Sequence, residues 1–244
     1  MTWIERIDRR FYPGIRDHWD DEIYRRRVLE HAGPEVDALE LGAGAGRVEQ
    51  MNFRGRFRCV AGVDPDERVL ENRFLDDARI GTGESIPWND ASFDLVFCDN
   101  VLEHLEDPLA VFREVARVLR PGGLFLAKTP NRWHYVTVGA RITPFWFHRV
   151  YNRWRGRDFV DTFPTRYRAN SVGQIARLAR DSELSRVAIE LIEGRPEYLR
   201  LAALPYLLGT AYERLVNRFD ALRHFRVVLI ATLRKGVHGR PGSA

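Results

Sequence analysis

The stretch DALELGAGAGRVEQ, residues 37–50, decides the fold. It begins with a short apolar run that contains one acid, Glu40, and continues with three glycines, Gly42, Gly44 and Gly46. This pattern predicts a buried strand followed by a tight turn, where residues without a side chain let the backbone come close to a ligand. The sequence therefore raises the question of which ligand approaches this turn.

A dinucleotide is the first candidate for that ligand. Its fingerprint is G-x-G-x-x-G/A on a strand-turn-helix unit, with small residues where the helix packs closely on the strand. Here Gly46 comes one position early, and Arg47 stands where a small residue is needed. The fingerprint fits poorly, and a turn that binds nothing stays open as an alternative when the loop is considered alone.

Strand-like and helix-like segments alternate along most of the chain. The expected strands are residues 37–42, 57–64, 78–83, 92–100, 124–130, 185–194 and 225–235. The expected helices are two within residues 3–32 and others at residues 47–53, 65–77, 107–120, 171–182 and 196–222. This alternation predicts an α/β fold with a doubly wound, mostly parallel sheet and helices on both faces.

Composition changes suggest five parts of the chain. They are an N-terminal helical cap, a ligand-binding core, an aromatic and basic insert, a segment that completes the sheet and a disordered tail, at residues 1–35, 36–130, 131–170, 171–235 and 236–244. The formal net charge is +4, yet residues 131–168 alone contain eight arginines and two acids. Because the basic residues are concentrated in this one segment, they indicate an anionic substrate or surface at one place. A nucleic-acid partner would need a broader basic face and is not expected.

The chain is expected to work in the cytoplasm as a monomer or homodimer. Cys59 and Cys98 lie in apolar runs and are expected to be buried free thiols in a reducing compartment. Residues 1–14 are charged throughout, so no signal peptide is expected, and the longest apolar run, residues 201–212, is interrupted by Pro205. A membrane-spanning helix needs about 20 apolar residues. Contact with a membrane is therefore expected to be peripheral at most.

The segments that follow the glycine loop narrow the choice of ligand. ELGAGAG, then GVDPDERVLENR, then the run from GESIPWND to FLAKTPN together resemble the class I S-adenosylmethionine-dependent methyltransferases, and most closely the type 11 subgroup. The resemblance covers roughly residues 36–131 in order. It implies a seven-stranded, Rossmann-like methyltransferase fold with an inserted substrate segment, and S-adenosylmethionine as the cofactor.

The resemblance also implies the cofactor-binding residues. They are Glu40, Gly42, Ala43, Gly44, Asp64, Pro65, Thr82, Gly83, Glu84 and Asn100. Asp64 would accept both ribose hydroxyls, because one carboxylate can take two hydrogen bonds; its alternative role is a helix N-cap before Pro65. Thr82 stands where relatives usually have an aspartate near the adenine, so this contact departs from the family pattern.

Two residues are candidates for catalysis, Asp99 and His104. Asp99 and Asn100 end an expected strand, at the edge of the sheet where ligands bind in open α/β folds. His104 could be the general base for an acceptor hydroxyl, since its usual pKa is near neutrality; a structural histidine and a loop-capping aspartate are the alternatives. The neighbouring acids Glu103, Glu106 and Asp107 are expected in a solvated turn and helix start. No metal site is expected.

The methyl acceptor is expected at the aromatic and basic insert. Its candidate substrate residues are Trp133, His134, Tyr135 and His148, because aromatic faces stack on sugars or flat rings. The predicted function is methyl transfer from S-adenosylmethionine to a small molecule, at a hydroxyl of a sugar or other anionic metabolite. A quinone, lipid or polyketide-like acceptor is one alternative. A non-catalytic protein that binds S-adenosylmethionine or a partner is the other.

Overall fold

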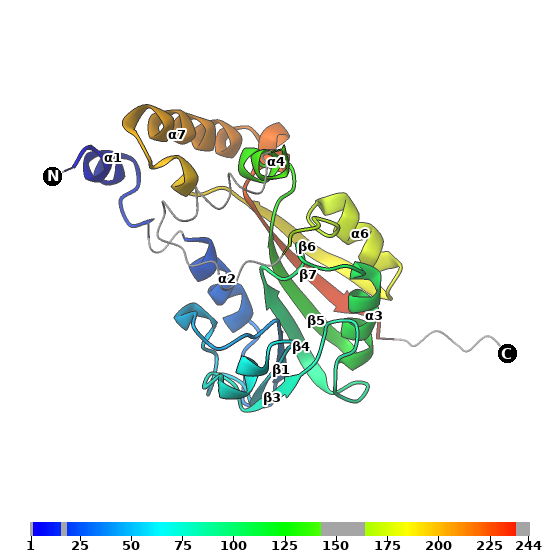
Figure 1. The fold of residues 1–244 in the computed structure, drawn as a ribbon. Helices are drawn as coiled ribbons and strands as arrows, with labels where there is room; N and C mark the ends of the chain where they lie inside the picture. The colour runs from blue at the N-terminus through cyan, green and yellow to red at the C-terminus, as the bar shows by residue number, and fades with distance from the viewer. Residues whose placement is uncertain (1, 16–18, 143–163, 238–244) are drawn as a thin grey trace.

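The computed structural model describes residues 2–15, 19–142 and 164–237. Their centre is a seven-stranded sheet in the order β3-β2-β1-β4-β5-β7-β6 (Figure 1). The strands are β1 Asp37–Leu41, β2 Cys59–Asp64, β3 Asp77–Ile80, β4 Phe93–Asp99, β5 Leu119–Pro130, β6 Leu184–Ile192 and β7 Val228–Lys235. The first five strands of the chain pair in parallel, and β7 is antiparallel to both of its neighbours. The predicted seven-stranded, mostly parallel sheet is confirmed.

The order of the strands reverses between β1 and β4. From β1 the chain continues outward to β2 and β3 and then returns to add β4 on the other side, with Leu39 paired to both Ala61 and Val96. Every residue of β1 is buried, as expected for a central parallel strand that is covered on both faces. Such a reversal opens a crevice at the carboxyl ends of the two strands, where ligands bind in this type of sheet.

Helices cover the two faces of the sheet unequally. On one face α3, Pro108–Val118, and α6, Val172–Arg180, bury their apolar sides against the sheet. On the other face lies α2, Asp20–Leu29, together with two short 3₁₀ turns, η2 Glu49–Met51 and η3 Glu67–Glu71. The second face is therefore closed by one helix and by turns that bring apolar side chains onto the sheet.

The helices predicted at residues 47–53 and 65–77 are wrong, because these segments form only the 3₁₀ turns. Phe53, the last residue of the first segment, packs edge-on against Phe97 at 5.1 Å and against Phe57 at 6.3 Å between ring centroids. Such tertiary contacts override local helix propensity. In the second segment Asn72 adopts an extended backbone and its side chain accepts a hydrogen bond from the backbone of Phe74. Local side-chain bonds of this kind compete with helix formation.

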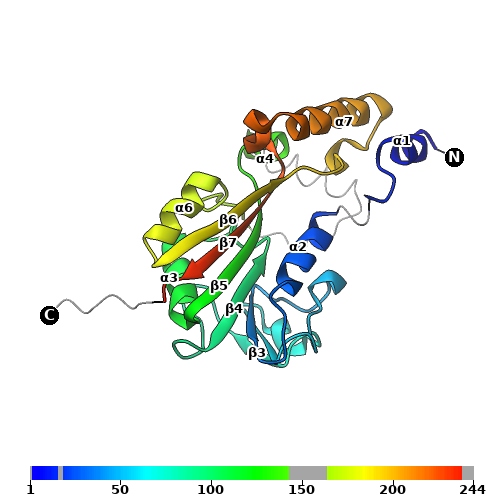
Figure 2. The ribbon, with the colours of Figure 1, turned by 180° about the vertical axis from the view of Figure 1, so that it is seen from behind.

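A cap of helices lies beyond the carboxyl ends of the central strands (Figures 1 and 2). It consists of α1 Trp3–Phe11, α4 Tyr135–Ile142 and α7 Ala203–Arg218, with the 3₁₀ turns η5 Glu197–Leu199 and η6 Asp220–Phe225. The helix predicted over residues 196–222 starts only at Ala203, which places Pro205 in its first turn, where proline is tolerated. The segment assigned to completing the sheet thus also supplies a cap helix. No helix in the described ranges is long and apolar enough to cross a membrane.

Candidate functional site

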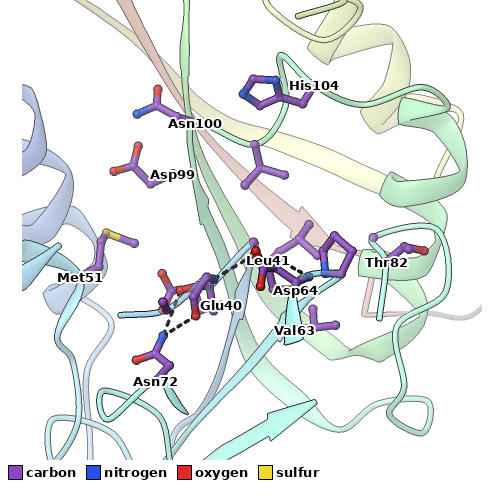
Figure 3. Close-up of a pocket in the computed structure, with 18 of the residues that line it drawn as sticks. Glu40, Leu41, Met51, Val63, Asp64, Asn72, Thr82, Asp99, Asn100 and His104 are labelled. Atoms are coloured by element: carbon purple, nitrogen blue, oxygen red, sulfur yellow. Dashed lines mark hydrogen bonds between the residues drawn. The ribbon is translucent and has the colours of Figure 1, made fainter. Parts of the chain in front are cut away.

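A cavity of about 680 Å³ opens at the carboxyl ends of β1, β2 and β4 (Figure 3). All ten predicted cofactor residues line it, and so do Asp99 and His104. In the view of Figure 3, Asp99, Asn100 and His104 lie above Glu40 and Asp64, and Thr82 lies to the right of Asp64. The residues that the sequence singled out from separate segments therefore lie around one hollow.

The glycine loop forms the floor of this cavity. Gly42 has a φ of +76°, and a Cβ atom built there would lie 2.4 Å from Cγ2 of Val101, so no larger residue fits. Gly44 also has a positive φ, of +48°, but a Cβ atom there would meet nothing within 4 Å. The bare backbone at Gly44 thus faces open space, as a surface for a flat ligand requires.

Asp64 joins the glycine loop to the chain that follows β2. Its Oδ2 accepts a hydrogen bond of 2.9 Å from the backbone N–H of Gly44, and its Oδ1 accepts one of 2.8 Å from Asp66. The N-cap of η3 is Asp66, whose side chain accepts from the backbone N–H of Arg68, so the N-cap role considered for Asp64 falls to its neighbour. Each oxygen of a carboxylate has two acceptor sites, so Asp64 can still accept from a ligand.

Asn72 is a site residue that the sequence reasoning missed. It is buried, and its Nδ2 donates to the carbonyl oxygens of Ala43 and Gly44 at 3.0 and 3.2 Å. These bonds hold the floor of the cavity, and Figure 3 shows them as dashed lines. The only signal in the sequence was an asparagine inside a predicted helix, where this residue is a weak helix former.

Two buried carboxyl groups stand at the ends of the central strands. Burial raises the pKa of Glu40 well above its usual value, and the charges of Asp99 and Asp64 raise it further. Burial also raises the pKa of Asp99 to about 7, although the cation of Lys128 opposes this shift. Both groups therefore take up protons far more readily than a carboxyl group in water.

Lys128, another residue that the sequence reasoning missed, is the cation under this edge of the sheet. Its side chain is 0% exposed, and its Nζ lies 3.0 Å from Oδ1 of Asp99 and 3.4 Å from Oδ2 of Asp20, and contacts Asp21. Asp20 and Asp21 belong to the first turn of α2. Lys128 thus joins α2 to a residue of the cavity wall. A lysine inside an expected buried strand was the available signal, because lysine is rarely buried without a partner.

The turn after β4 differs from its sequence prediction at Glu103. This side chain is buried and its Oε2 accepts a hydrogen bond of 3.0 Å from Thr129, and burial raises its pKa to about 7. Glu106 is exposed and Asp107 caps α3, as a solvated turn and helix start require. The expectation of a solvated group is therefore wrong for Glu103 alone.

His104 lies on the cavity wall beside Glu103. Its Nδ1 is 3.0 Å from the carbonyl oxygen of Pro164, and its Nε2 is 3.9 Å from Oε1 of Glu103. A carbonyl oxygen can only accept a hydrogen bond, so the hydrogen of the neutral ring belongs on Nδ1. In that tautomer Nε2 is the acceptor atom of the ring.

The predicted substrate residues lie elsewhere. Trp133, His134 and Tyr135 are outside the described lining of the cavity, and His148 lies outside the described residues. His134 is buried, its Nε2 is 3.5 Å from Glu193, and its ring packs against Tyr135 and Tyr212. Among the described contacts, His134 connects the end of β5 to the cap helix α7.

S-adenosylmethionine carries a sulfonium, an ammonium and a carboxylate group, so its net charge is positive. The acids of the described lining are Glu40, Asp64, Asp66, Glu84, Asp99 and Glu106, against the bases Arg47 and Arg68. An acid-rich hollow with an open glycine floor fits a flat, cationic ligand.

Comparison with known proteins gives the family. The methyltransferase domain family matches residues 39–127. A Mycolicibacterium smegmatis protein named a probable S-adenosylmethionine-dependent methyltransferase is 37% identical over 50% of this chain and 50% of its own length. A ubiquinone biosynthesis O-methyltransferase of a Methylobacterium species is 30% identical over 63% of this chain and 70% of its own length.

Among solved structures, a Haloferax volcanii methyltransferase in complex with the Trm112 methyltransferase activator shares the fold. Its TM-score is 0.60 at 18% identity, over 98% of this chain and 96% of that one. A glycine-floored, acid-lined cavity at the switch point of a seven-stranded sheet, together with these matches, defines a class I methyltransferase. The chain belongs to the S-adenosylmethionine-dependent methyltransferase family. Several of the curated relatives are matched over only about half of their length.

Proposed function

We propose that this protein transfers the methyl group of S-adenosylmethionine to a hydroxyl group of a small molecule. The observation that supports it most directly is the open floor at Gly44, with Asp64 hydrogen-bonded to its backbone N–H and acids around it. When bound, S-adenosylmethionine supplies an electrophilic methyl group on a positively charged sulfur. The protein then has two tasks: to hold the acceptor hydroxyl in line with the methyl group of the cofactor, and to remove the proton of that hydroxyl.

The cofactor would lie on the glycine loop. Gly42, Ala43 and Gly44 would offer the flat surface, and Asp64 would accept the ribose hydroxyls while it keeps its bonds to the loop. Pro65 would border the ribose, Thr82, Gly83 and Glu84 the adenine, and Glu40 and Asn100 the methionine end of the cavity. Asn72 would keep the loop in place through its two bonds to backbone carbonyls.

His104 is the general base of this proposal. Its Nε2 would accept the proton of the acceptor hydroxyl, and the carboxyl group of Glu103 at 3.9 Å would stabilise the imidazolium that forms. The carbonyl of Pro164 would hold the ring in the tautomer that leaves Nε2 as an acceptor. Asp99, beside Lys128, would place negative charge close to the reacting groups and attract the cationic cofactor.

The acceptor is proposed to be a sugar or another anionic metabolite, whose charged part would contact the basic insert at residues 131–170. An anionic group would be repelled by the acids of the cavity, so only its neutral hydroxyl would approach the methyl group. A quinone-like acceptor is the second candidate, because relatives of similar identity are named ubiquinone biosynthesis O-methyltransferases.

The test is methyl transfer from radiolabelled S-adenosylmethionine to a panel of hydroxylated sugars, nucleotide-sugars and quinol precursors. The proposal expects one class to be labelled at oxygen. It also expects His104→Asn to lower kcat by about 10²–10⁴-fold, the usual share of a general base, while cofactor affinity stays unchanged. Equal rates for the variant and the wild-type protein would exclude His104 as the base. Tight cofactor binding without transfer to any hydroxyl would favour a non-catalytic binding protein.

A further inference from the structure

The cap helix α7 presents an apolar stripe to solvent. Large apolar side chains recur along it at spacings of three, four and seven residues and are exposed at 43–68%, namely Leu204, Leu207, Leu208 and Leu215, and Phe219 continues the stripe just past its end. Residues with these spacings lie on one side of a helix. The opposite side of α7 is buried, through Tyr206, Thr210 and Glu213. The stripe is therefore not the side that the fold uses for its own packing.

Arg214 and Arg218 lie on α7 beside this stripe, and the neighbouring helix α1 carries further exposed arginines. The exposed charged residues of α1 and α7 are five arginines and one acid, namely Arg6, Arg9, Arg10, Arg214, Arg218 and Glu5. Arg214 Nη2 donates a hydrogen bond of 2.7 Å to the carbonyl oxygen of Phe11, which brings the C-terminal turn of α1 to the edge of α7. Figures 1 and 2 show the two helices next to each other at one end of the molecule.

Two of the three acids of these helices, Asp8 and Glu213, form bonds within the fold. Asp8 bonds to Tyr206 and to Arg200 at 2.7 Å, between α1 and the chain that leads into α7. Glu213 is buried, accepts a hydrogen bond of 2.7 Å from Asn217, and its Oε2 lies 3.3 Å from Nε of Arg214. The exposed charge of the two helices is therefore positive, and the bond of Asp8 to Tyr206 joins α1 to α7.

We infer that the outer surface of α1 and α7 binds to anionic lipid membranes, with the leucines of α7 in the acyl region and the arginines at the headgroups. An exposed apolar stripe bordered by arginines is the pattern of a helix that lies in a membrane interface. Charge complementarity favours lipid as the occupant. A second copy of the chain would bring the same arginines against each other, and like charges across an interface are repulsive.

The experiment is co-sedimentation of the full chain with vesicles of phosphatidylcholine alone or mixed with phosphatidylglycerol. The wild-type protein is expected to bind the mixed vesicles and to be released by high salt. Leu204→Ser combined with Leu208→Ser is expected to lower binding by at least about tenfold, because it removes apolar area from the membrane. Arg218→Gln is expected to lower it by about fivefold, the effect of one basic residue at an anionic surface.

Leu70→Ser is the matched control, because Leu70 is 58% exposed on η3, outside the cap. It is expected to bind the mixed vesicles like the wild-type protein. Titration of each variant with S-adenosylmethionine checks that the fold is intact and separates this inference from the proposed function, on which it does not rest. Absence of wild-type binding to the mixed vesicles, or equal binding by the double variant, would overturn the inference. It would also be overturned by a dimer in sedimentation that the double variant dissociates, without vesicle binding.

Discussion

The two N-terminal helices are attached to the molecule by different kinds of ion cluster. α2 is attached through Lys128, whose fully buried ammonium group lies 3.0 Å from Asp99 and contacts Asp21. α1 is attached through Asp8, whose carboxylate bonds to Tyr206 and Arg200 in a cluster that keeps 12–27% of its charged side chains exposed. The first cluster joins a buried pair of the sheet, Lys128 and Asp99, to two half-buried acids of α2. The second lies between α1 and the chain that leads into α7.

This difference separates a core helix from a cap helix. Lys128 is 0% exposed and Asp99 is 13% exposed, so loss of the ammonium group leaves the carboxyl group of Asp99 buried without a cation. Asp20 and Asp21 are 32% and 31% exposed and keep their contact with water. In the α1 cluster, Asp8 and Arg200 are 24% and 27% exposed, so water can replace a lost partner of either. We therefore expect changes at the α2 cluster to disturb folding and the cavity, and changes at the α1 cluster to affect mainly the cap.

The largest effect is expected for Lys128→Met. Removing one partner of a buried ion pair costs about 3–5 kcal/mol of unfolding free energy, because here the carboxyl group of Asp99 would stay buried without a cation. Lys235→Met is the matched control, because Lys235 is the only other lysine of the chain. It is partly exposed, and its Nζ donates a hydrogen bond of 2.7 Å to the carbonyl oxygen of Leu119. Urea denaturation measures both variants. Equal losses of unfolding free energy in the two variants would show that Lys128 stabilises the fold no more than Lys235 does.

A pH-dependent effect of similar size is expected at Glu103. Burial raises its pKa from 4.5 to about 7, so the folded state binds its proton more tightly than the unfolded state does. The stabilisation by this proton is fully present below pH 4.5 and is lost as the pH rises through about 7; the total change is roughly 3 kcal/mol. Glu103→Gln should flatten the stability curve in this window. Glu106→Gln changes an exposed neighbour and should leave the slope of stability against pH as in the wild-type protein. A flattened curve for both variants would contradict the assignment of this pH dependence to Glu103.

A smaller effect is expected for Asp64→Ala, on binding rather than on folding. The loss of hydrogen bonds to a charged acceptor should weaken S-adenosylmethionine binding by about 1.5–3 kcal/mol. Asp66→Ala, one turn along, removes the N-cap of η3 but no proposed ribose contact and serves as the control. Calorimetric titration distinguishes the two. An unchanged affinity for the Asp64 variant would exclude it as the ribose acceptor.

The smallest effect is expected for Asp8→Asn in the cap. Burial raises the pKa of Asp8, but the hydrogen bond from Tyr206 and the charges of Arg195 and Arg200 lower it below its usual value. A solvent-screened cluster of this kind contributes about 0.2–1 kcal/mol. Thermal unfolding at neutral pH should therefore show a loss within that range. A loss as large as that of Lys128→Met would place α1 in the core and remove the distinction between the two helices.

The sequence predicted the cofactor half of the molecule far better than the cap. The glycine loop, Asp64 and the end of β4 belong to short local patterns, so each could be placed on a strand or turn before the structure was known. Lys128 was missed because its partners Asp20 and Asp21 are over 100 residues away in the chain. The local sequence predicts helices at η2 and η3, but aromatic packing and the bonds of Asn72, which are tertiary contacts, override this local propensity.

Calorimetric titration of the wild-type protein and of Gly44→Val with S-adenosylmethionine and, separately, with NADH decides whether the glycine floor binds this cofactor. Micromolar binding of S-adenosylmethionine alone is expected for the wild-type protein, and loss of binding for the variant, because the new side chain would occupy the open floor of the cavity. Binding of NADH, or equal affinity of a folded Gly44→Val variant for S-adenosylmethionine, would contradict this expectation.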